Sequence, residues 1–503
     1  MFVLINTLAT DRRKNIFPLG LAYVAACFEK FGRVKVFDLH FDNDINQLFD
    51  YFFENEVKFV GFSVCSSHEN ISRSSHIAKM IKRISPNTII GVGGPHATYQ
   101  GYDIIKHHTE FDVAMIGEGE LSSVQIAENI SLNKGNYYEG VNNIVYRNSK
   151  GEIIISEYKK NDVYLLPARH LFNTCKEYSD KFDEELPVVC IESTRGCVGK
   201  CSFCALKLDP TKSYVKKDLA LFREDLEYTL STQNLEKVDL FFVDADFLIS
   251  KNRAKEILEI IKSFHQVRYF NIASCSDSLL RSKDILGELF ECGCTYIEIG
   301  VESFSHQQLE RYDKRSSIET NIQAIELLNQ MQNIYNFSFK IDIIMFEPFA
   351  TIDDIRISNE YLQKYTYASS LNESNFFHIM ELFPGTKYRA ITEKSKLSSP
   401  SSEMDVPFWR FENDDVAELY KYVTLYNNKV LIDKDKIEHK LENKIYKEKS
   451  RELLYLKDLR TLKTITYDWF NELVLAKDSL LYFQICKKYF KLYDDIKERY
   501  WEE

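Results

Sequence analysis

Three cysteines are the first residues whose types and spacing indicate chemistry. They stand as Cys197-x3-Cys201-x2-Cys204 in the segment ESTRGCVGKCSFC, the one tight group among the eleven cysteines of the 503-residue chain. A long chain without a secretion signal seldom depends on a disulfide framework, so clustered thiols indicate metal binding or redox chemistry.

Three thiolates in one loop favour an iron–sulfur cluster. Structural zinc usually takes four protein ligands, commonly as two separated pairs. A [4Fe–4S] cube has four irons, so three cysteines leave one iron without a protein ligand. Catalytic metal sites keep such an open position for substrate or cofactor. A zinc site with a distant fourth ligand and three unligated buried cysteines remain the alternatives.

The segments around this loop alternate between strand and helix patterns. Strands are predicted at residues 188–191, 238–243, 268–273, 296–299, 337–346 and 376–382. About six strands joined by helix-length segments predict a partial (β/α)6 barrel, whose chemistry belongs at the carboxyl ends of its strands. Asp244, Asp246 and Glu302 lie at such ends, and the cysteine loop follows the first strand directly.

The first 125 residues repeat the alternation. Strands are predicted at residues 2–4, 34–37, 58–64, 88–92 and 113–116, and helices at 19–28 and 71–84. This order predicts a Rossmann-like, doubly wound parallel sheet, which binds ligands beyond the carboxyl ends of its strands. The glycine pairs of loops 91–98 and 117–120 would let a backbone approach a ligand closely. The same loops, with loop 63–68, could be no more than tight turns.

Changes of pattern divide the chain into four parts. Residues 141–186 have the character of a connector, with a hairpin pattern around 148–151 and a charged, turn-rich stretch after it. A Ser/Pro linker near residue 400 precedes segments with helical periodicity. We therefore expect a Rossmann-like domain at 1–140, a connector at 141–186, a barrel at 187–397 and a helical region at 398–503.

Composition narrows the class of protein. With 45% hydrophobic residues the chain can fill several cores. Its 75 acidic and 64 basic residues leave a formal charge of −11, which argues against a nucleic-acid or anionic-membrane partner. The apolar runs are shorter than a bilayer requires, and the start of the chain lacks the features of a signal peptide. A cytoplasmic protein is the expectation.

Seven motifs in register make the sequence resemble the radical S-adenosylmethionine (SAM) superfamily, in the subgroup with an N-terminal cobalamin-binding domain. They occur over residues 17–386 as FPLGLAYVAACFEKFG, VGFSVCSS, IIGVGGPHAT, MIGEGE, the RGC cysteine loop, IEIGVES and FPGT. Each motif alone is weak, and their shared order carries the resemblance. The segment 346–351 departs from the glycine-containing turn that relatives often show there.

The resemblance implies roles for barrel residues. Cys197, Cys201 and Cys204 would bind a [4Fe–4S] cluster whose free iron chelates SAM. Phe203 would pack beside the cluster and the adenine, although plain core packing is the alternative. Further SAM contacts would come from Glu302 and from Asp244 or Asp246. A salt bridge is the alternative for Glu302, and Lys314 could be its partner.

In the N-terminal domain the resemblance implies a cobalamin site. The corrin face would be lined by Ser63, Cys65 and Ser66, and the nucleotide tail would be cradled by Gly93, Gly94, Thr98, Glu118, Gly119 and Glu120. Asp38-x-His40 resembles a cobalt-ligating motif but follows the wrong strand, so we expect base-off cobalamin without a protein histidine ligand. A domain that keeps the fold without the cofactor is the alternative.

The reaction implied is methylation of an unactivated carbon in a peptide or natural-product intermediate. One SAM would methylate cob(I)alamin, and a second would be cleaved to a 5′-deoxyadenosyl radical, with electrons from an external flavodoxin- or ferredoxin-type reductant. Alternatives are a non-methylating radical reaction such as cyclisation, oxidation or rearrangement, a non-catalytic cobalamin or iron–sulfur sensor, and an RNA-modifying enzyme.

No catalytic residue can be assigned from the sequence. Cys275, Cys292 and Cys294 are expected to be small buried hydrophobes. His378, on the predicted sixth strand, would face the barrel mouth or be hydrogen-bonded in the core.

Overall fold

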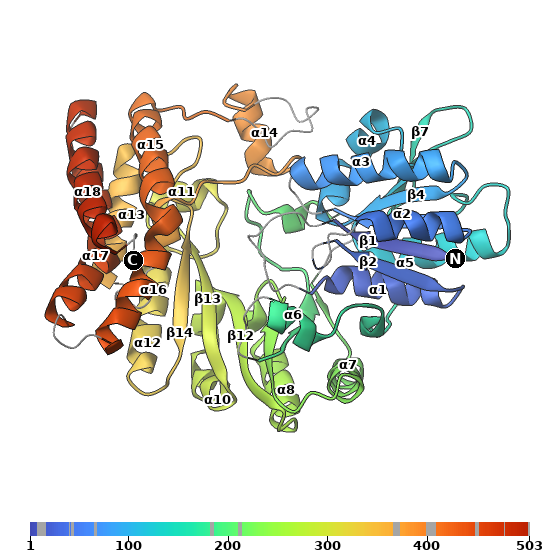
Figure 1. Ribbon diagram of the computed structural model, residues 1–503, viewed down its shortest axis with the longest axis horizontal. Helices are drawn as coiled ribbons and strands as arrows, with labels where there is room; N and C mark the ends of the chain where they lie inside the picture. The colour runs from blue at the N-terminus through green and yellow to red at the C-terminus, as the bar shows by residue number, and fades with distance from the viewer. Residues whose placement is uncertain are drawn as a thin grey trace.

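The computed structural model describes residues 1–7, 17–39, 41, 45–64, 68–181, 186–209, 214–365, 373–398, 409–447, 452–476 and 478–500. An N-terminal α/β part, a central sheet and a group of C-terminal helices follow one another along the long axis of the molecule (Figure 1). The three parts follow one another in space in the same order as in the sequence. The α/β class and the arrangement predicted from the sequence are confirmed.

The N-terminal sheet has the strand order β2-β1-β3-β4-β5-β6-β7. Its parallel strands are β1 (Phe2–Asn6), β2 (Val34–Asp38), β3 (Phe59–Ser63), β4 (Ile89–Gly93) and β5 (Val113–Met115). Every residue of β1 is buried, as expected for a strand covered on both faces. Because β1 lies between β2 and β3, the strand order reverses there, and loops on either side of this point leave a space for a ligand.

Helices cover both faces of this sheet. They are α1 (Leu19–Glu29), α2 (Ile45–Glu54), α3 (His68–Ile84), α4 (Pro95–His107) and α5 (Gly119–Ser131). Apolar residues of α1 and α5 form one core with the sheet, and those of α2, α3 and α4 form the other. Figure 1 shows α3 and α4 above the sheet and α1 below it.

The predicted hairpin is present and extends the N-terminal sheet. Strands β6 (Ile144–Arg147) and β7 (Ile153–Ile155) pair with each other, and β6 pairs with β5, all antiparallel. A short 3₁₀ helix η2 (Arg169–Leu171) and helix α6 (Cys175–Lys181) follow on the way to the barrel. The hairpin is thus an edge of the first sheet, and the domain limits given above remain a prediction.

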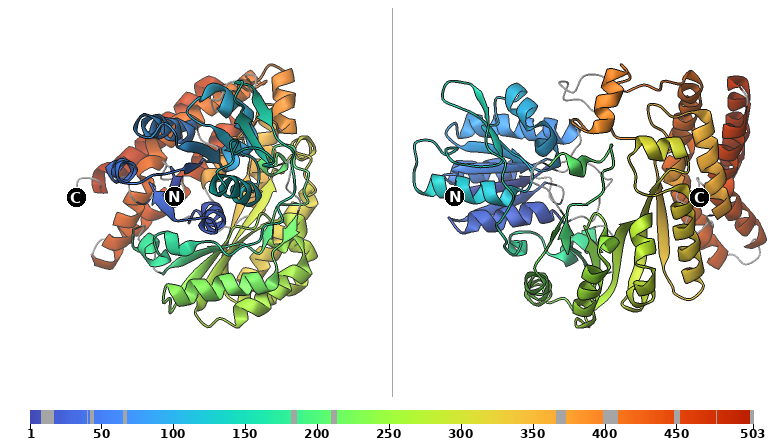
Figure 2. Two further views of the ribbon diagram at one scale, coloured as in Figure 1. Left: turned by 90° about the vertical axis from the view of Figure 1, so that its right-hand side faces the viewer. Right: turned by 180° about the vertical axis from the view of Figure 1, so that it is seen from behind.

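The central sheet is wholly parallel and has the order β14-β13-β12-β11-β8. Its strands are β8 (Val188–Ile191), β11 (Val238–Phe242), β12 (Val267–Cys275), β13 (Cys294–Glu302) and β14 (Ser338–Ile343). From Tyr296 to Glu302 of β13 the residues alternate between half-buried and buried, so one face packs under the helices and the other faces the concave interior. Figure 2 shows these strands curving with helices on their outer side.

Helices join the barrel strands as the periodicity predicts. They are α7 (Leu219–Thr232), α8 (Lys251–Lys262), α9 (Ser276–Arg281), α10 (Leu286–Glu291), α11 (His306–Arg311), α12 (Ile318–Gln332) and α13 (Ile352–Tyr365). Two 3₁₀ turns, η4 (Phe247–Ile249) and η5 (Lys283–Ile285), lie between them.

The sixth barrel segment is shorter than predicted. Residues 376–382 contribute an isolated parallel bridge between Phe346 and Ile379, after the 3₁₀ helix η6 (Glu373–Phe376). The amide of Phe346 donates to the carbonyl of His378, and that of Met380 donates to the carbonyl of Phe346. The turn that contains Gly385, with φ of +84°, then leads the chain into α14 (Lys387–Lys394), so the pairing goes no further.

The C-terminal region is helical, as predicted. It comprises α15 (Asp414–Tyr426), the π-helix η7 (Asn427–Leu431), α16 (Ile432–Lys447), α17 (Glu452–Leu475) and α18 (Ser479–Tyr500). Its core includes Trp469, which stacks on Tyr426 at 3.7 Å between ring centroids. Arg356 of α13 donates to the carbonyl of Val474 at 2.8 Å, which fastens these helices to the outside of the barrel. None of the described helices has the length and apolarity of a membrane span.

Candidate functional site

The cysteine loop begins where β8 ends. Strand β9 (Thr194–Arg195) precedes it, and the 3₁₀ helix η3 (Ala205–Lys207) follows it. Strand β10 (Val215–Lys216), later in the chain, pairs antiparallel with β9 in a two-stranded ribbon. Gly196, with φ of +77°, turns the chain into Cys197. The amide of Gly199 donates to Cys197 Sγ at 3.3 Å, and a Cβ at Gly199 would lie 3.3 Å from that sulfur and 3.9 Å from Cys201 Sγ. The loop therefore winds closely around a glycine that leaves room for sulfur.

The three thiols fit a cube better than a single ion. Within the described ranges, no three His, Cys, Asp or Glu side chains are gathered so as to hold one metal ion. A closed zinc site needs four ligands at one ion, whereas a [4Fe–4S] cube presents separate irons to separate cysteines. Cys197 and Cys204 both lie near enough to Cys201 to influence its titration, and burial raises the pKa of Cys201 to about 11. That thiol therefore needs a cationic partner such as iron to ionise at neutral pH.

Hydrogen bonds hold the loop against the far side of the barrel. Ser202 donates through its amide to the carbonyl of Tyr312 at 2.8 Å and through Oγ to the carbonyl of Arg311 at 2.7 Å. Phe203 meets the Tyr312 ring edge-on at 5.4 Å between centroids and packs on an apolar cluster that includes Tyr388. Phe203 thus has a packing role, and its contact with cluster or adenine remains a prediction.

The two aspartates after β11 brace the mouth of the barrel. Asp244 accepts from the amide and hydroxyl of Ser193 at 2.8 and 2.7 Å and from the Thr194 hydroxyl at 2.6 Å. Asp246 accepts from the hydroxyls of Ser274 and Ser278, each at 2.7 Å. Burial raises the pKa of both carboxyl groups. The protein already supplies partners to both groups, and a SAM contact by either remains a prediction.

Glu302 and Lys314 form an ion pair, 2.9 Å apart, which was the alternative given for Glu302; its contact with SAM remains a prediction. Glu302 has a φ of +70°, an uncommon conformation for a residue with a side chain. A Cβ at Gly300 would lie 3.0 Å from the Glu302 carboxylate and 3.3 Å from the Lys314 nitrogen. Glu302, together with Cys275 and Cys201, raises the pKa of the buried Lys314 against the opposing effect of burial. A permanent positive charge therefore lies beside the cysteine loop.

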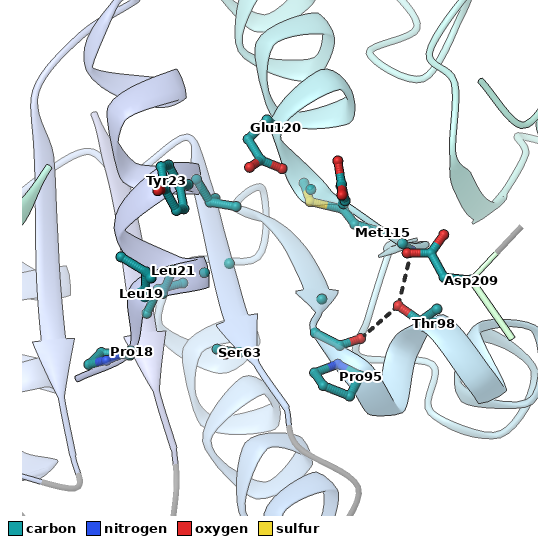
Figure 3. Close-up of a pocket in the computed structure, with 18 of the residues that line it drawn as sticks. Pro18, Leu19, Leu21, Tyr23, Ser63, Pro95, Thr98, Met115, Glu120 and Asp209 are labelled. Atoms are coloured by element: carbon teal, nitrogen blue, oxygen red, sulfur yellow. Dashed lines mark hydrogen bonds between the residues drawn. The ribbon is translucent and has the colours of Figure 1, made fainter. Parts of the chain in front are cut away.

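A cavity of about 530 Å³ lies between the N-terminal sheet and the cysteine loop. The N-terminal residues predicted to bind cobalamin that line it are Ser63, Gly93, Gly94, Thr98, Glu118, Gly119 and Glu120. The barrel supplies Thr194, Arg195, Gly196, Ala205, Leu206, Asp209, Val243 and Ala245. Figure 3 shows labelled side chains reaching the space from several elements. Cys65 and Ser66 were also predicted there and lie outside the described residues.

Two loops of the N-terminal domain are tied together at this cavity. Thr98 Oγ1 donates to the carbonyl of Gly94 at 3.0 Å and accepts from the amide of Gly117 at 3.0 Å (Figure 3). Gly94 has a φ of +100°, and a Cβ there would lie 2.7 Å from the carbonyl oxygen of Val64. The cavity edge thus requires a glycine, which fits a backbone that cradles a large ligand.

The apolar wall of the cavity was not predicted from the sequence. It consists of Leu4, Phe17, Leu19, Leu21, Tyr23, Phe28, Phe59, Phe62 and Met115. Several of these belong to the FPLGLAY motif, which was noted only as part of the resemblance. The motif itself was the available signal, because a predicted helix carrying it must lie against the predicted sheet.

The role of Arg195 in the site was also not predicted from the sequence. Its Nη1 lies 2.6 Å from Glu120 and 3.5 Å from Glu118, and its Nη2 lies 2.7 Å from Glu192. The two glutamates predicted to cradle a nucleotide tail are therefore bound to the cysteine loop. Burial raises the pKa of Glu120, and Arg195 opposes that rise.

The remaining candidates lie near the mouth or serve the core. His378 Nδ1 is 2.8 Å from the carbonyl of Ile343 at the end of β14, and the side chain is exposed. Cys275 ends β12, and burial raises its pKa to about 12. Cys294 is buried, as expected of a small hydrophobe, whereas Cys292 is half-buried. Asp38 accepts from Asn6 Nδ2 at 2.9 Å and from the Tyr178 hydroxyl, which gives it a structural role, and His40 lies outside the described residues.

Two family models match the chain. Residues 5–127 match the B12 binding domain, and residues 191–357 match the radical SAM superfamily. The first match covers the sheet with the glycine loops, and the second covers the cysteine loop and the strands β11 to β14.

Curated relatives are distant. The hopanoid C-3 methylase of Methylococcus capsulatus is 27% identical over 320 residues, covering 62% of this chain and 59% of that protein. An uncharacterized methyltransferase of Pyrococcus horikoshii, PH0819, is 23% identical and covers 84% of this chain and 90% of its own length.

Solved structures share the fold over most of the chain. The cobalamin-dependent SAM radical enzyme OxsB with aqua-cobalamin bound aligns with a TM-score of 0.81 and 16% identity, over 99% of this chain and 80% of that one. The radical SAM methyltransferase TsrM from Kitasatospora setae, with cobalamin and a [4Fe–4S] cluster bound, aligns with a TM-score of 0.64 and 16% identity, over 80% of this chain and 79% of its own.

Proposed function

Because the chain belongs to the cobalamin-binding subgroup of the radical SAM superfamily and is a radical SAM enzyme, we propose that it methylates an unactivated carbon of a peptide or natural-product intermediate. The observation that carries the proposal is a cavity of about 530 Å³ whose walls come from both matched domains. A cavity placed this way would let both cofactors act on one substrate.

Cys197, Cys201 and Cys204 would hold the [4Fe–4S] cluster, and the loops at Gly93–Gly94 and Glu118–Glu120 would hold cobalamin. When bound, the cluster with SAM supplies a 5′-deoxyadenosyl radical that removes a hydrogen atom, and cobalamin supplies the methyl group. The substrate would be a small molecule or peptide, and the electrons would come from a flavodoxin- or ferredoxin-type protein.

The chain's own residues position these groups and exclude water. The apolar side chains that α1, β1 and β3 contribute to the cavity would help to exclude water and so protect a radical intermediate. Lys314 places a positive charge 2.9 Å from Glu302 and near Cys201 of the cysteine loop. This pair would offer a cation and a carboxylate to the charged ends of SAM.

Names of the relatives support methylation. Besides the hopanoid methylase, the chain is 22% identical over 303 residues to the cobalamin-dependent radical SAM methyltransferase TokK of Streptomyces tokunonensis. A second candidate is a non-methylating radical reaction. It is favoured by similarity to the 4′-phospho-dehydrooxetanocin synthase of Priestia megaterium and to two magnesium-protoporphyrin IX monomethyl ester cyclases, which are not named as methyltransferases.

The test is anaerobic reconstitution with iron, sulfide and cobalamin, followed by incubation with SAM and a strong reductant. We expect visible absorption from both cofactors and formation of both 5′-deoxyadenosine and S-adenosylhomocysteine. Formation of 5′-deoxyadenosine without S-adenosylhomocysteine would select the non-methylating reaction. Intact SAM in fully loaded protein would favour a sensor and refute both reactions.

A further inference from the structure

We propose that Arg195 is a positioning residue that couples the cobalamin cavity to the cysteine loop, so that each cofactor site reports on occupation of the other. The inference rests on the proposed function, since it needs both cofactors. Its basis is a guanidinium that lies two residues before Cys197 and binds carboxylates of the opposite domain.

The guanidinium connects two loops that line one cavity. Its Nη1 donates at 2.6 Å to Glu120, in the first turn of α5, and lies 3.5 Å from Glu118, the residue that caps this helix. Its Nε and Nη2 lie 2.8 and 2.7 Å from Glu192, at the end of β8. Glu118, Glu120, Glu192 and Arg195 also line the cavity. A ligand that presses on either loop therefore acts on these contacts.

The surroundings hold Arg195 in place. In the ribbon it pairs with Val215, and its guanidinium stacks on the Tyr23 ring of α1 at 4.7 Å. The Tyr23 hydroxyl accepts from Lys217 at 2.9 Å, and Lys217 lies 3.0 Å from the buried Asp225. A side chain so constrained cannot follow the loop at Glu118–Glu120 without moving the backbone that leads into Cys197.

The excess of negative charge around Arg195 makes its contacts with the three glutamates strong. Three carboxylates face one guanidinium, and the exposed fractions of these side chains are 15% for Glu118, 6% for Glu120, 12% for Glu192 and 22% for Arg195. Removing the cation would leave three neighbouring, largely buried carboxylates, which repel one another. The two loops would then separate, and the cavity would lose its connection to the cysteine loop.

Coupling of this kind is reciprocal, because a ligand that changes the affinity of a second site is itself affected by the same factor. The experiment measures cobalamin affinity from the corrin absorption spectrum of cluster-loaded protein, with and without SAM. It also records the electron paramagnetic resonance spectrum of the reduced cluster, with and without cobalamin. Neither readout depends on turnover.

We expect SAM to change the cobalamin dissociation constant of the wild type by about tenfold, within the usual range of coupling between sites. Arg195→Gln should abolish this change and make the cluster spectrum insensitive to cobalamin. Arg195→Lys should retain part of the SAM-dependent change in cobalamin affinity, since lysine keeps the charge without the bidentate geometry. Glu120→Gln should lose the coupling between SAM and cobalamin as Arg195→Gln does. The double variant Arg195→Gln/Glu120→Gln should lose no more of this coupling than either single variant.

The matched control is Lys251→Gln, which removes an exposed ion pair with Asp284 elsewhere on the barrel. It should behave as the wild type. If Arg195→Gln does not fold, Arg195→Lys and Glu120→Gln carry the comparison. Wild-type protein that binds both cofactors with independent affinities would overturn the coupling and leave the function standing. Wild-type protein that binds no cobalamin would overturn the proposed function itself.

Discussion

At the scale of the residue, the chemistry depends on three thiols and on the charges beside them. Cys197, Cys201 and Cys204 follow one another around Gly199, and the buried Lys314 lies near enough to oppose the rise in the pKa of Cys201. A thiolate in such a loop is stabilised by iron and by a fixed cation. The positions of these residues support the proposal that the loop holds the cluster.

Replacing one ligand tests this arrangement. Cys201→Ala should reduce bound iron from on the order of four atoms per chain to nearly none, because three cysteines supply all the protein ligands of the cube. Iron analysis and visible absorption after anaerobic reconstitution measure the loss. Cys292→Ala, which changes a half-buried cysteine outside the loop, is the control and should keep its iron. An iron-loaded Cys201→Ala protein would contradict the assignment.

Replacing a glycine tests the N-terminal side of the cavity. Gly94→Ala places a Cβ 2.7 Å from the carbonyl oxygen of Val64 at a φ of +100°. We expect about 1–3 kcal/mol of strain and weaker cobalamin binding. Gly135→Ala is the matched control, since nothing lies within 4 Å of its added Cβ. Thermal unfolding and a corrin titration separate the two effects, and equal behaviour of the two variants would refute the strained turn.

At the scale of the element, the interior face of the barrel carries a charged row. Glu298 of β13 and Asp342 of β14 lie 3.0 and 2.8 Å from Lys340. Burial and the nearby Glu298 raise the pKa of Asp342 to about 7, while Lys340 opposes them. Two carboxylates and one ammonium therefore share the interior, with Asp342 and Glu298 paired beside Lys340.

This pair predicts a dependence of stability on pH. The raised folded-state pKa means that the folded protein binds more protons than the unfolded chain between about pH 4 and 7. The stability contributed by Asp342 is therefore greatest at the acid end of this window and falls as the pH rises through it. Asp342→Asn removes the titration, so it should raise the thermal midpoint at pH 7 relative to wild type more than at pH 5.

The control for this prediction is Asp284→Asn, which changes a carboxylate that is 54% exposed. It should shift the midpoint similarly at both values of pH. A fall in the midpoint of Asp342→Asn at pH 7 would show that the charged form of Asp342 stabilises the barrel through Lys340.

At the scale of the whole molecule, the C-terminal helices pack on the barrel at the end away from the N-terminal sheet (Figure 1). Their core includes Trp469, whose Nε1 lies 3.5 Å from Cys486 Sγ and whose ring stacks on Tyr426. Among the residues that the structure describes, none of those in these helices lines the cavity between the two domains. This separation predicts that the helices contribute to stability more than to cofactor binding.

Trp469→Ala tests that division. Truncating a fully buried tryptophan should cost about 3–5 kcal/mol and lower the thermal midpoint. Cobalamin and iron content, measured well below that midpoint, should equal those of the wild type. Leu453→Ala, at a side chain that is 85% exposed, is the control for a change on the same helix. Loss of cofactor from folded Trp469→Ala would place these helices in the site.

Much of the fold and the core of the site could be predicted from the sequence. Strand and helix periods are local, and so is the spacing of Cys197, Cys201 and Cys204, which a loop of eight residues brings together whatever the rest of the chain does. The glycines of the N-terminal loops were likewise visible, because a backbone that turns sharply at a strand end needs them. The positions of these loops follow from the parallel sheet itself.

Only the tertiary structure decided which side chains the site uses for support. Arg195 pairs with Glu120, which is 75 positions away in the sequence. Asp244 accepts from Ser193, which is 51 positions away, so no local period reveals either pair. The sixth barrel segment shortened to one bridge because the turn at Gly385 leads the chain elsewhere. Contacts between distant segments depend on how whole layers pack, and that information is spread over the chain.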